Sequence, residues 1–214
     1  YAAALENGVD PCEYISNEKV VFEDYNNWSP RNADEEYGGE YSMEGALTRS
    51  VNIVSVNLLM KIGARKVLEF AQKTGIREQL PPVPSLALGT AELSLLELVS
   101  SYATLANRGI YHAPQLILRI EDRNGRILMH APVAESGEQA CSQETADMIT
   151  YMLKGVVNRG TAAGLRSRYG LTQDIAGKTG TTQLQADGWF IGMTPRLVAG
   201  GWGGGGEPGR GFPV

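Results

Sequence analysis

Apolar positions recur at helical spacing through most of the chain and at strand spacing near its end. Between Val51 and Ile62 the residues are apolar almost all round, which predicts a helix buried on every side. Amphipathic helices, each with one apolar face, are predicted over residues 64–75, 94–107 and 142–160.

Capping residues mark where several of these helices begin and end. Ser42 and Ser142 are each placed to cap a helix, because a serine side chain can accept a bond from a free N–H of the first turn. Ser94 with Glu97 fits the capping-box pattern. The first seven residues are typical of the last turns of a helix that Gly8 stops.

Three strands are predicted late in the chain, at Ile175–Thr181, Trp189–Met193 and Leu197–Trp202. Short turns join them, so we expect antiparallel neighbours. A separate hairpin is predicted from Leu116–Glu121 and Arg126–His130, because an Asn-Gly pair lies between these two runs. Helices early and strands late predict an α+β fold, in which helices cover an antiparallel sheet.

Two segments depart from regular periodicity. From Val9 to Tyr41 the chain is polar, which predicts a long irregular connection with one short strand near Lys19–Phe22. Loops of this length inside a compact domain are usually functional. At the other end, residues 200–211 contain eight glycines. We therefore expect one domain over residues 1–202, and a flexible or altered tail over residues 203–214.

The composition is that of an ordinary globular domain, with 214 residues, 43% apolar and 20% charged. The net charge of −5 is uneven, since residues 1–44 carry −9 and the remainder carries +4. We interpret the acidic stretch as a solvated surface, while the positive remainder favours an anionic ligand. Lysine and arginine do not cluster, so nucleic acid is not expected as a partner.

Cysteine and histidine are scarce. Cys12 and Cys141 are too few for a disulfide scaffold; they can pair, but two buried free thiols are the favoured interpretation. His112 and His130 have no Cys or carboxylate partner at ligand spacing, so no metal site is predicted. No apolar run approaches the roughly 18 residues of a membrane-spanning helix.

The first candidate for chemistry is Lys178-Thr179-Gly180-Thr181, on a predicted strand. Because side chains alternate along a strand, Thr179 and Thr181 would share one face while Lys178 projects from the other. Gly180 lets a ligand lie close to the backbone, and the N–H of Thr181 can stabilise an oxyanion. The alternative is a surface lysine beside a strand glycine.

The second candidate is Ser50-Val51-Asn52, where a loop enters the predicted buried helix. A serine can relay a proton, and an asparagine can hold an amide by donating and accepting at once. Such triplets are common, and Ser55-Val56-Asn57 is another. A capping serine with a nearby polar asparagine is the alternative. We assign the function to the first triplet and a structural role to the second, in which Ser55 is expected to bond a carbonyl one turn back.

Taken together, Ser-x-Asn followed far downstream by Lys-Thr-Gly resembles the signature of the penicilloyl-serine transferases. The chain resembles the later part of the transpeptidase domain of class A, bifunctional penicillin-binding proteins. The resemblance covers about residues 1–202, and the best matching segments are DIAGKTGTT at 174–182 and DGWFIGMTPRLV at 187–198. It implies a serine β-lactamase/transpeptidase-like fold and no cofactor.

The resemblance implies a D,D-transpeptidase that cross-links peptidoglycan stem peptides through an acyl-serine, and that β-lactams trap. By position, Ser50 would relay a proton, Asn52 would hold the donor amide, and Lys178 would set a positive potential. Thr179 and Thr181 would bind the terminal carboxylate beside Gly180, with the Thr181 N–H in the oxyanion hole.

The family's Ser-x-x-Lys element, which carries the nucleophile, would fall a few residues before Tyr1. We therefore expect a fragment that starts just after this element and is inactive alone. The parent would lie on the periplasmic side of the membrane, anchored by a segment outside this chain. Two alternatives stay open: a D,D-carboxypeptidase, β-lactamase or β-lactam sensor of the same fold, and a non-catalytic cell-wall-binding module.

Overall fold

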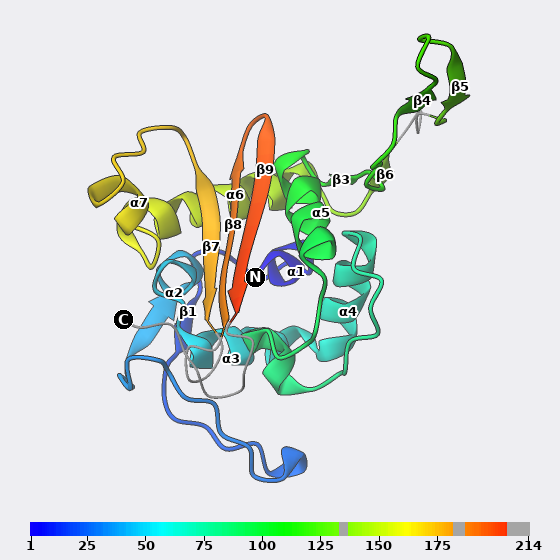
Figure 1. Cartoon of the computed structure of the whole chain (residues 1–214). Helices are drawn as coiled ribbons and strands as arrows, with labels where there is room; N and C mark the ends of the chain where they lie inside the picture. Colours follow the sequence, from blue (N-terminus) through cyan, green and yellow to red (C-terminus); the bar gives the residue numbers. More distant parts are fainter. Residues whose placement is uncertain (133–136, 182–186, 205–214) are drawn as a thin grey trace.

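The computed structural model describes residues 1–132, 137–181 and 187–204. Helices dominate the chain up to residue 167, and strands follow (Figure 1). The helices are α1 (Ala2–Glu6), α2 (Met43–Arg49), α3 (Asn52–Ile62), α4 (Ala64–Lys73), α5 (Leu95–Ala106), α6 (Gln143–Arg159) and α7 (Gly164–Ser167), with 3-10 turns η1 (Glu23–Tyr25) and η2 (Pro84–Leu88).

The central sheet is antiparallel and has the strand order β7-β8-β9. Its strands are β7 (Ala176–Thr181), β8 (Asp187–Thr194) and β9 (Leu197–Gly204). Three small antiparallel pairs lie outside it: β1 (Tyr14–Ser16) with β2 (Glu40–Ser42), β3 (Ile110–Tyr111) with β6 (Glu138–Gln139), and β4 (Arg119–Glu121) with β5 (Ile127–His130).

Helices cover the central sheet, as the sequence predicts. α6 packs against β7, and α5 packs against β8 and β9 (Figure 1). The buried side of α6 also contacts α2, so the core lies between these helices and the sheet. The fully buried Met152 and Val156 of α6 and Met43 of α2 belong to this core, together with Ala176 of β7. The α+β fold class is confirmed.

The predicted helix caps are present. Ser42 Oγ accepts a bond from the N–H of Gly45 at 3.2 Å, and Ser142 Oγ accepts one from Thr145 at the same distance. Ser94 and Glu97 form a complete capping box at the start of α5. These caps are local in sequence, which explains why the pattern of residues was sufficient to predict them.

The predicted hairpin exists and extends away from the body of the molecule (Figure 1). Gly125 sits in its turn with φ +81°, a conformation that favours glycine. The Asp122 carboxylate accepts bonds from the main-chain N–H groups of Asn124 and Arg126, at 2.8 and 3.0 Å. The turn is therefore fixed by local chemistry, although every residue of β4 and β5 is exposed.

The strand predicted near Lys19–Phe22 is wrong. The strand in this region is β1, in which Ile15 is buried between two exposed neighbours and pairs with Tyr41 of β2. Phe22 forms only an isolated bridge with Trp28, against which its ring stacks. A short apolar run becomes a strand only where another strand can pair with it, and β2 pairs with β1.

The strand predicted at Leu197–Trp202 is two residues longer in the structure. Gly203 and Gly204 continue β9, opposite Gly188 and Asp187 of β8. The ladder uses main-chain groups, so it does not need side chains to continue. Trp202, the last large side chain before them, packs against Trp189 across the sheet at 6.1 Å between ring centroids. The rest of the predicted tail, residues 205–214, lies outside the described residues.

Both cysteines are free, but only one is buried. Cys141 is 3% exposed in the core, where burial and the nearby Glu6 raise the pKa of its thiol to about 11. Cys12 is exposed in a turn, in which its N–H donates to the Asp10 carboxylate at 2.8 Å. The expectation of two buried thiols is therefore wrong for Cys12, because this turn is polar and lies at the surface.

Candidate active site

The structure brings Ser50 and Lys178 together, although 128 residues separate them. The Lys178 ammonium Nζ donates to Ser50 Oγ at 2.8 Å and to the main-chain oxygen of Thr179 at 2.9 Å. One residue comes from the end of α2 and the other from β7. The bond therefore joins the helical part of the molecule to the edge of its central sheet.

Ser50 occupies a left-handed conformation where α2 ends, with φ 58° and ψ 46°. This conformation is uncommon for a residue with a side chain. Two main-chain hydrogen bonds hold this conformation: the N–H of Ser50 donates to the oxygen of Leu47, and the N–H of Val51 donates to the oxygen of Ala46. The chain reverses here before α3 begins at Asn52, and the corner presents the Ser50 hydroxyl to β7.

Burial lowers the pKa of Lys178 to about 8, because a low-polarity environment disfavours the ammonium form. At neutral pH the side chain is mostly protonated and supplies a positive charge. Above pH 8 it is mostly neutral, and Nζ can then accept a proton from a neighbouring hydroxyl. A lysine with a pKa lowered in this way is suited to either electrostatic stabilisation or proton transfer.

Some main-chain N–H and C=O groups of β7 face its open edge, the side away from β8. In an antiparallel ladder, alternate residues point their N–H and C=O groups to opposite sides of the strand. Since Thr179 O accepts a bond from the Lys178 side chain, its main-chain groups face away from β8. The N–H of Thr181, two residues on, faces the same way. This is the orientation that an oxyanion donor requires.

Gly180 lies between these two threonines and against Trp189 of β8. A β-carbon at this position would lie 3.2 Å from Cβ of Trp189, tighter than most such contacts. The Thr179 hydroxyl is 2.6 Å from that of Thr161, which follows α6. Thr181 is exposed. The structure thus places Thr179, Gly180 and Thr181 in one row beside Lys178.

Asn52 begins α3, and its side-chain amide donates to the main-chain oxygen of Arg31 at 2.7 Å. The second triplet behaves differently. Ser55 Oγ donates to Val51 O at 2.9 Å, one turn back, as predicted. Asn57 Nδ2 donates to Ser16 O of β1 at 2.9 Å. The second triplet therefore ties α3 to its surroundings, whereas the first lies next to the Ser50–Lys178 bond.

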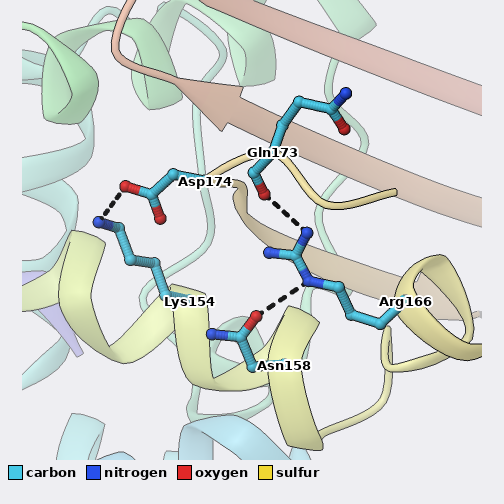
Figure 2. Close-up of polar contacts among 5 residues, drawn as sticks. All are labelled: Lys154, Asn158, Arg166, Gln173 and Asp174. Carbon is cyan, nitrogen blue, oxygen red and sulfur yellow. Dashed lines mark hydrogen bonds and ion pairs between the residues drawn. The ribbon is translucent and has the colours of Figure 1, made fainter. Parts of the chain in front are cut away.

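A set of polar contacts fixes the segment that leads into β7 (Figure 2). Lys154 of α6 and Asp174 form an ion pair at 2.6 Å. The Arg166 guanidinium donates to the main-chain oxygen of Gln173 at 2.6 Å and to Asn158 Oδ1 at 3.0 Å. These contacts anchor the chain four and five residues before Lys178, so they set where β7 starts.

Residues that the sequence analysis did not single out also build the site. Thr161 contacts Thr179, and Arg31 holds Asn52. Asn32 is 5% exposed, and its Oδ1 accepts a bond from the N–H of Ile53. Arg31 and Asn32 lie in the stretch from Val9 to Tyr41 that is predicted to be a polar connection, and Thr161 follows the predicted end of a helix at Gly160. A polar residue in a polar stretch carries no local signal of burial, so only the fold could identify them.

Within residues 1–132, 137–181 and 187–204, no group of three or more His, Cys, Asp or Glu side chains is arranged to hold a metal ion. In the same part of the chain, no helix is both long enough and apolar enough to cross a membrane.

Comparison with known families identifies the chain. The model of the penicillin-binding protein transpeptidase domain matches residues 1–198. The chain therefore belongs to the family of penicillin-binding protein transpeptidase domains. This match covers α1 through β8, including Ser50, Asn52 and the Lys178–Thr181 strand.

Individual relatives agree with this assignment. Penicillin-binding protein 1A of Aquifex aeolicus is 38% identical over 205 residues, covering 94% of this chain and 27% of that protein. Penicillin-binding protein 1A of Neisseria gonorrhoeae is 34% identical, covering 92% of this chain and 26% of that protein. The chain thus spans about a quarter of these relatives. The resemblance to class A penicillin-binding proteins is confirmed.

Solved structures show the same fold. Penicillin-binding protein 1A from Haemophilus influenzae superposes with a TM-score of 0.89 at 26% identity, covering 99% of this chain and 37% of that one. The PonA1 protein of Mycobacterium tuberculosis in complex with penicillin V gives a TM-score of 0.79 at 27% identity, covering 94% of this chain and 56% of that one.

Proposed function

We propose that the protein containing this chain is a peptidoglycan D,D-transpeptidase that works through an acyl-serine intermediate and is trapped by β-lactams. The observation that carries the proposal is the hydrogen bond from Lys178 to Ser50, made beside a strand whose Thr181 N–H faces outward. Membership of the transpeptidase family supports it. The protein would act on the periplasmic side of the membrane, anchored by another segment.

In this proposal the nucleophile is a serine of the Ser-x-x-Lys element, supplied by the segment ahead of Tyr1. Its oxygen adds to the carbonyl carbon of the D-Ala-D-Ala peptide bond, while its proton passes to the lysine of the same element and from there to Ser50. The carbon–nitrogen bond then breaks, and Ser50 passes a proton to the departing amine of D-Ala. An amine of a neighbouring stem peptide next attacks the acyl-serine and restores the serine hydroxyl. A β-lactam undergoes the first step in the same way and then stays attached to the serine as an acyl-enzyme.

Lys178 and the β7 residues would recognise the donor. The Lys178 ammonium attracts the terminal carboxylate, which Thr179 and Thr181 bind through their hydroxyl groups. The N–H of Thr181 stabilises the negative oxygen that forms on the attacked carbonyl. Asn52 would hold the donor amide from the other side of Ser50. No cofactor is needed for these steps.

Two other functions predict different products. A D,D-carboxypeptidase, β-lactamase or β-lactam sensor of the same fold would pass the acyl group to water, or keep it. A non-catalytic cell-wall-binding module would form no acyl-serine. The long DGWFIGMTPRLV match at 187–198 and the hairpin after residue 114 favour the transpeptidase.

The test uses the full-length protein with a fluorescent penicillin, followed by a stem pentapeptide ending in D-Ala-D-Ala and an amine acceptor. The transpeptidase predicts one covalent adduct per molecule and a cross-linked product, both visible by mass spectrometry. Tetrapeptide without cross-link would indicate a carboxypeptidase, and fast penicillin turnover a β-lactamase. Absence of an adduct would exclude catalysis.

A further inference from the structure

We propose that Thr161 is a positioning residue, which orients the hydroxyl of Thr179 so that this hydroxyl donates to the carboxylate of the donor. The inference rests on the proposed function and adds a residue to it. Its basis is the 2.6 Å contact between Thr161 Oγ1 and Thr179 Oγ1.

The position of Thr161 is fixed from two sides. Its main-chain N–H donates to the main-chain oxygen of Thr48 at 3.3 Å. Gly160, just before it, approaches Thr48 so closely that a β-carbon there would lie far inside van der Waals contact with that oxygen. Thr161 therefore lies against the end of α2, at Thr48, which is two residues before Ser50.

The direction of the hydroxyl bond follows from proton counting. Each threonine hydroxyl has one proton to donate. If Thr179 donates to a carboxylate, its oxygen can only accept from Thr161, so Thr161 must be the donor in their shared bond. A hydroxyl that accepts one bond also donates a stronger one, because the chain of bonds is polarised. Thr161 thereby directs the Thr179 proton toward the donor carboxylate.

The same end of α2 thus holds two of the ligand-binding residues of β7, Lys178 and Thr179. Ser50 bonds Lys178, and Thr48 holds Thr161, which contacts Thr179. The two links fix the strand against the helix end in one register. Loss of the Thr161 hydroxyl should leave the first link in place, so the effect should fall on carboxylate recognition and spare the acylation chemistry.

The experiment compares acylation of the full-length protein by benzylpenicillin and by its methyl ester, which lacks the carboxylate. Thr161→Val removes the hydroxyl and keeps the shape. We expect it to lower the second-order acylation rate with benzylpenicillin about tenfold, the scale of one hydrogen bond to a charged group. The rate with the methyl ester should change less than twofold. Thr161→Ser should restore the benzylpenicillin rate.

Two further variants separate positioning from general damage. Thr90→Val breaks another bond between hydroxyl groups, that of Thr90 to Ser85 at 3.2 Å, and should leave both rates unchanged. In a Thr179→Val background, Thr161→Val should have no additional effect, because its target hydroxyl is gone.

Three outcomes would overturn the inference: an equal loss with both substrates, additive losses in the double variant, or an unchanged benzylpenicillin rate in Thr161→Val. A parent protein that penicillin does not acylate would overturn the proposed function, and the inference with it. A parent that is acylated normally, with any of the three outcomes above, would overturn the inference alone.

Discussion

The side-chain oxygen of Asn32 accepts a hydrogen bond from the main-chain N–H of Ile53 at 3.1 Å, across 21 residues of sequence. α3 begins after Val51, which has no polar side chain to cap it. Asn32 therefore caps this helix from the long acidic loop. Its amide donates in turn to Asn17 Oδ1 and to the main-chain oxygen of Glu36, both at 2.7 Å. The loop is thus bound to the helix that carries Asn52.

Asn32→Ala should destabilise the protein by about 1–3 kcal/mol, because it leaves buried polar partners unsatisfied. The measurement is urea unfolding, with Gln72→Ala as the control, since Gln72 is an exposed amide on α4. Arg31 neighbours Asn32 and holds Asn52, so acylation by penicillin should also slow. Unchanged stability in Asn32→Ala would contradict the capping role.

Asn52→Ala and Asn57→Ala should separate function from stability. Asn52→Ala is expected to slow penicillin acylation of the full-length protein about tenfold or more, as for a lost substrate hydrogen bond, while the protein stays folded and loses no more stability than Asn57→Ala. Asn57→Ala should leave acylation intact and lower stability, because its bond to Ser16 ties α3 to β1. The reverse result would show that the roles were assigned to the wrong triplet.

Features that depend on neighbouring residues were predictable from the sequence. The capping box of Ser94 and Glu97 acts within one helical turn, and the turn at Gly125 needs only its own backbone. The Lys178–Thr181 strand was also located, because its glycine and threonines alternate as the site requires. In each case the physical cause lies within a few residues.

Features that depend on distant partners were not predictable. β1 forms where β2 can pair with it, so the strand lies at Tyr14–Ser16 instead of Lys19–Phe22. Asn32 and Thr161 gain their roles only when the loop meets α3 and when α6 meets α2. Both are ordinary polar residues, and no local pattern distinguishes them from their neighbours.

The pH dependence of acylation should report on Lys178. Its pKa is lowered to about 8, so its charge is present below pH 8 and lost above it. The rate with benzylpenicillin should fall as the pH rises through 8, because the carboxylate loses its positive partner, whereas the rate with the methyl ester should not. Lys178→Gln should remove this alkaline decline. A decline that persists in Lys178→Gln would assign it to another group.

The same shift predicts a pH effect on stability. Between pH 8 and the usual lysine pKa of 10.5, the unfolded chain binds a proton at Lys178 that the folded chain does not. The free energy of unfolding should therefore rise with pH in this window, relative to Lys178→Gln. Urea unfolding at pH 8 and pH 10 would measure it. A parent that loses stability relative to the variant would contradict the burial of the ammonium group.

The two thiols should differ sharply in reactivity. Cys12 is exposed, whereas burial of Cys141 raises its thiol pKa to about 11 and blocks access. A thiol reagent should label one cysteine quickly in the folded protein and two after unfolding. Cys12→Ser should abolish the fast labelling. Fast labelling of Cys141 in the folded state would show that the core around α6 opens readily.

The hydrogen bonds of Arg166 to the segment before β7 allow a test of how this strand is positioned. The Arg166 guanidinium donates to the main-chain oxygen of Gln173 and to Asn158 Oδ1 (Figure 2). It also donates to the main-chain oxygen of Leu171. A lysine could not reproduce this geometry, since it lacks the planar set of donors. Arg166→Met should therefore release the segment that sets the start of β7 and, through it, Lys178.

We expect Arg166→Met to lower the melting temperature by about 2–4 °C, as for a loss of about 1 kcal/mol in a chain of this size. Acylation by penicillin should slow as well, because Lys178 is less firmly held against Ser50. Arg168→Met is the matched control: Arg168 is exposed, and its guanidinium carbon lies over the ring of Tyr169, 5.9 Å from the ring centroid. If both variants slowed acylation equally, the effect would come from the loss of surface charge. The hydrogen bonds of Arg166 would then have no part in positioning β7.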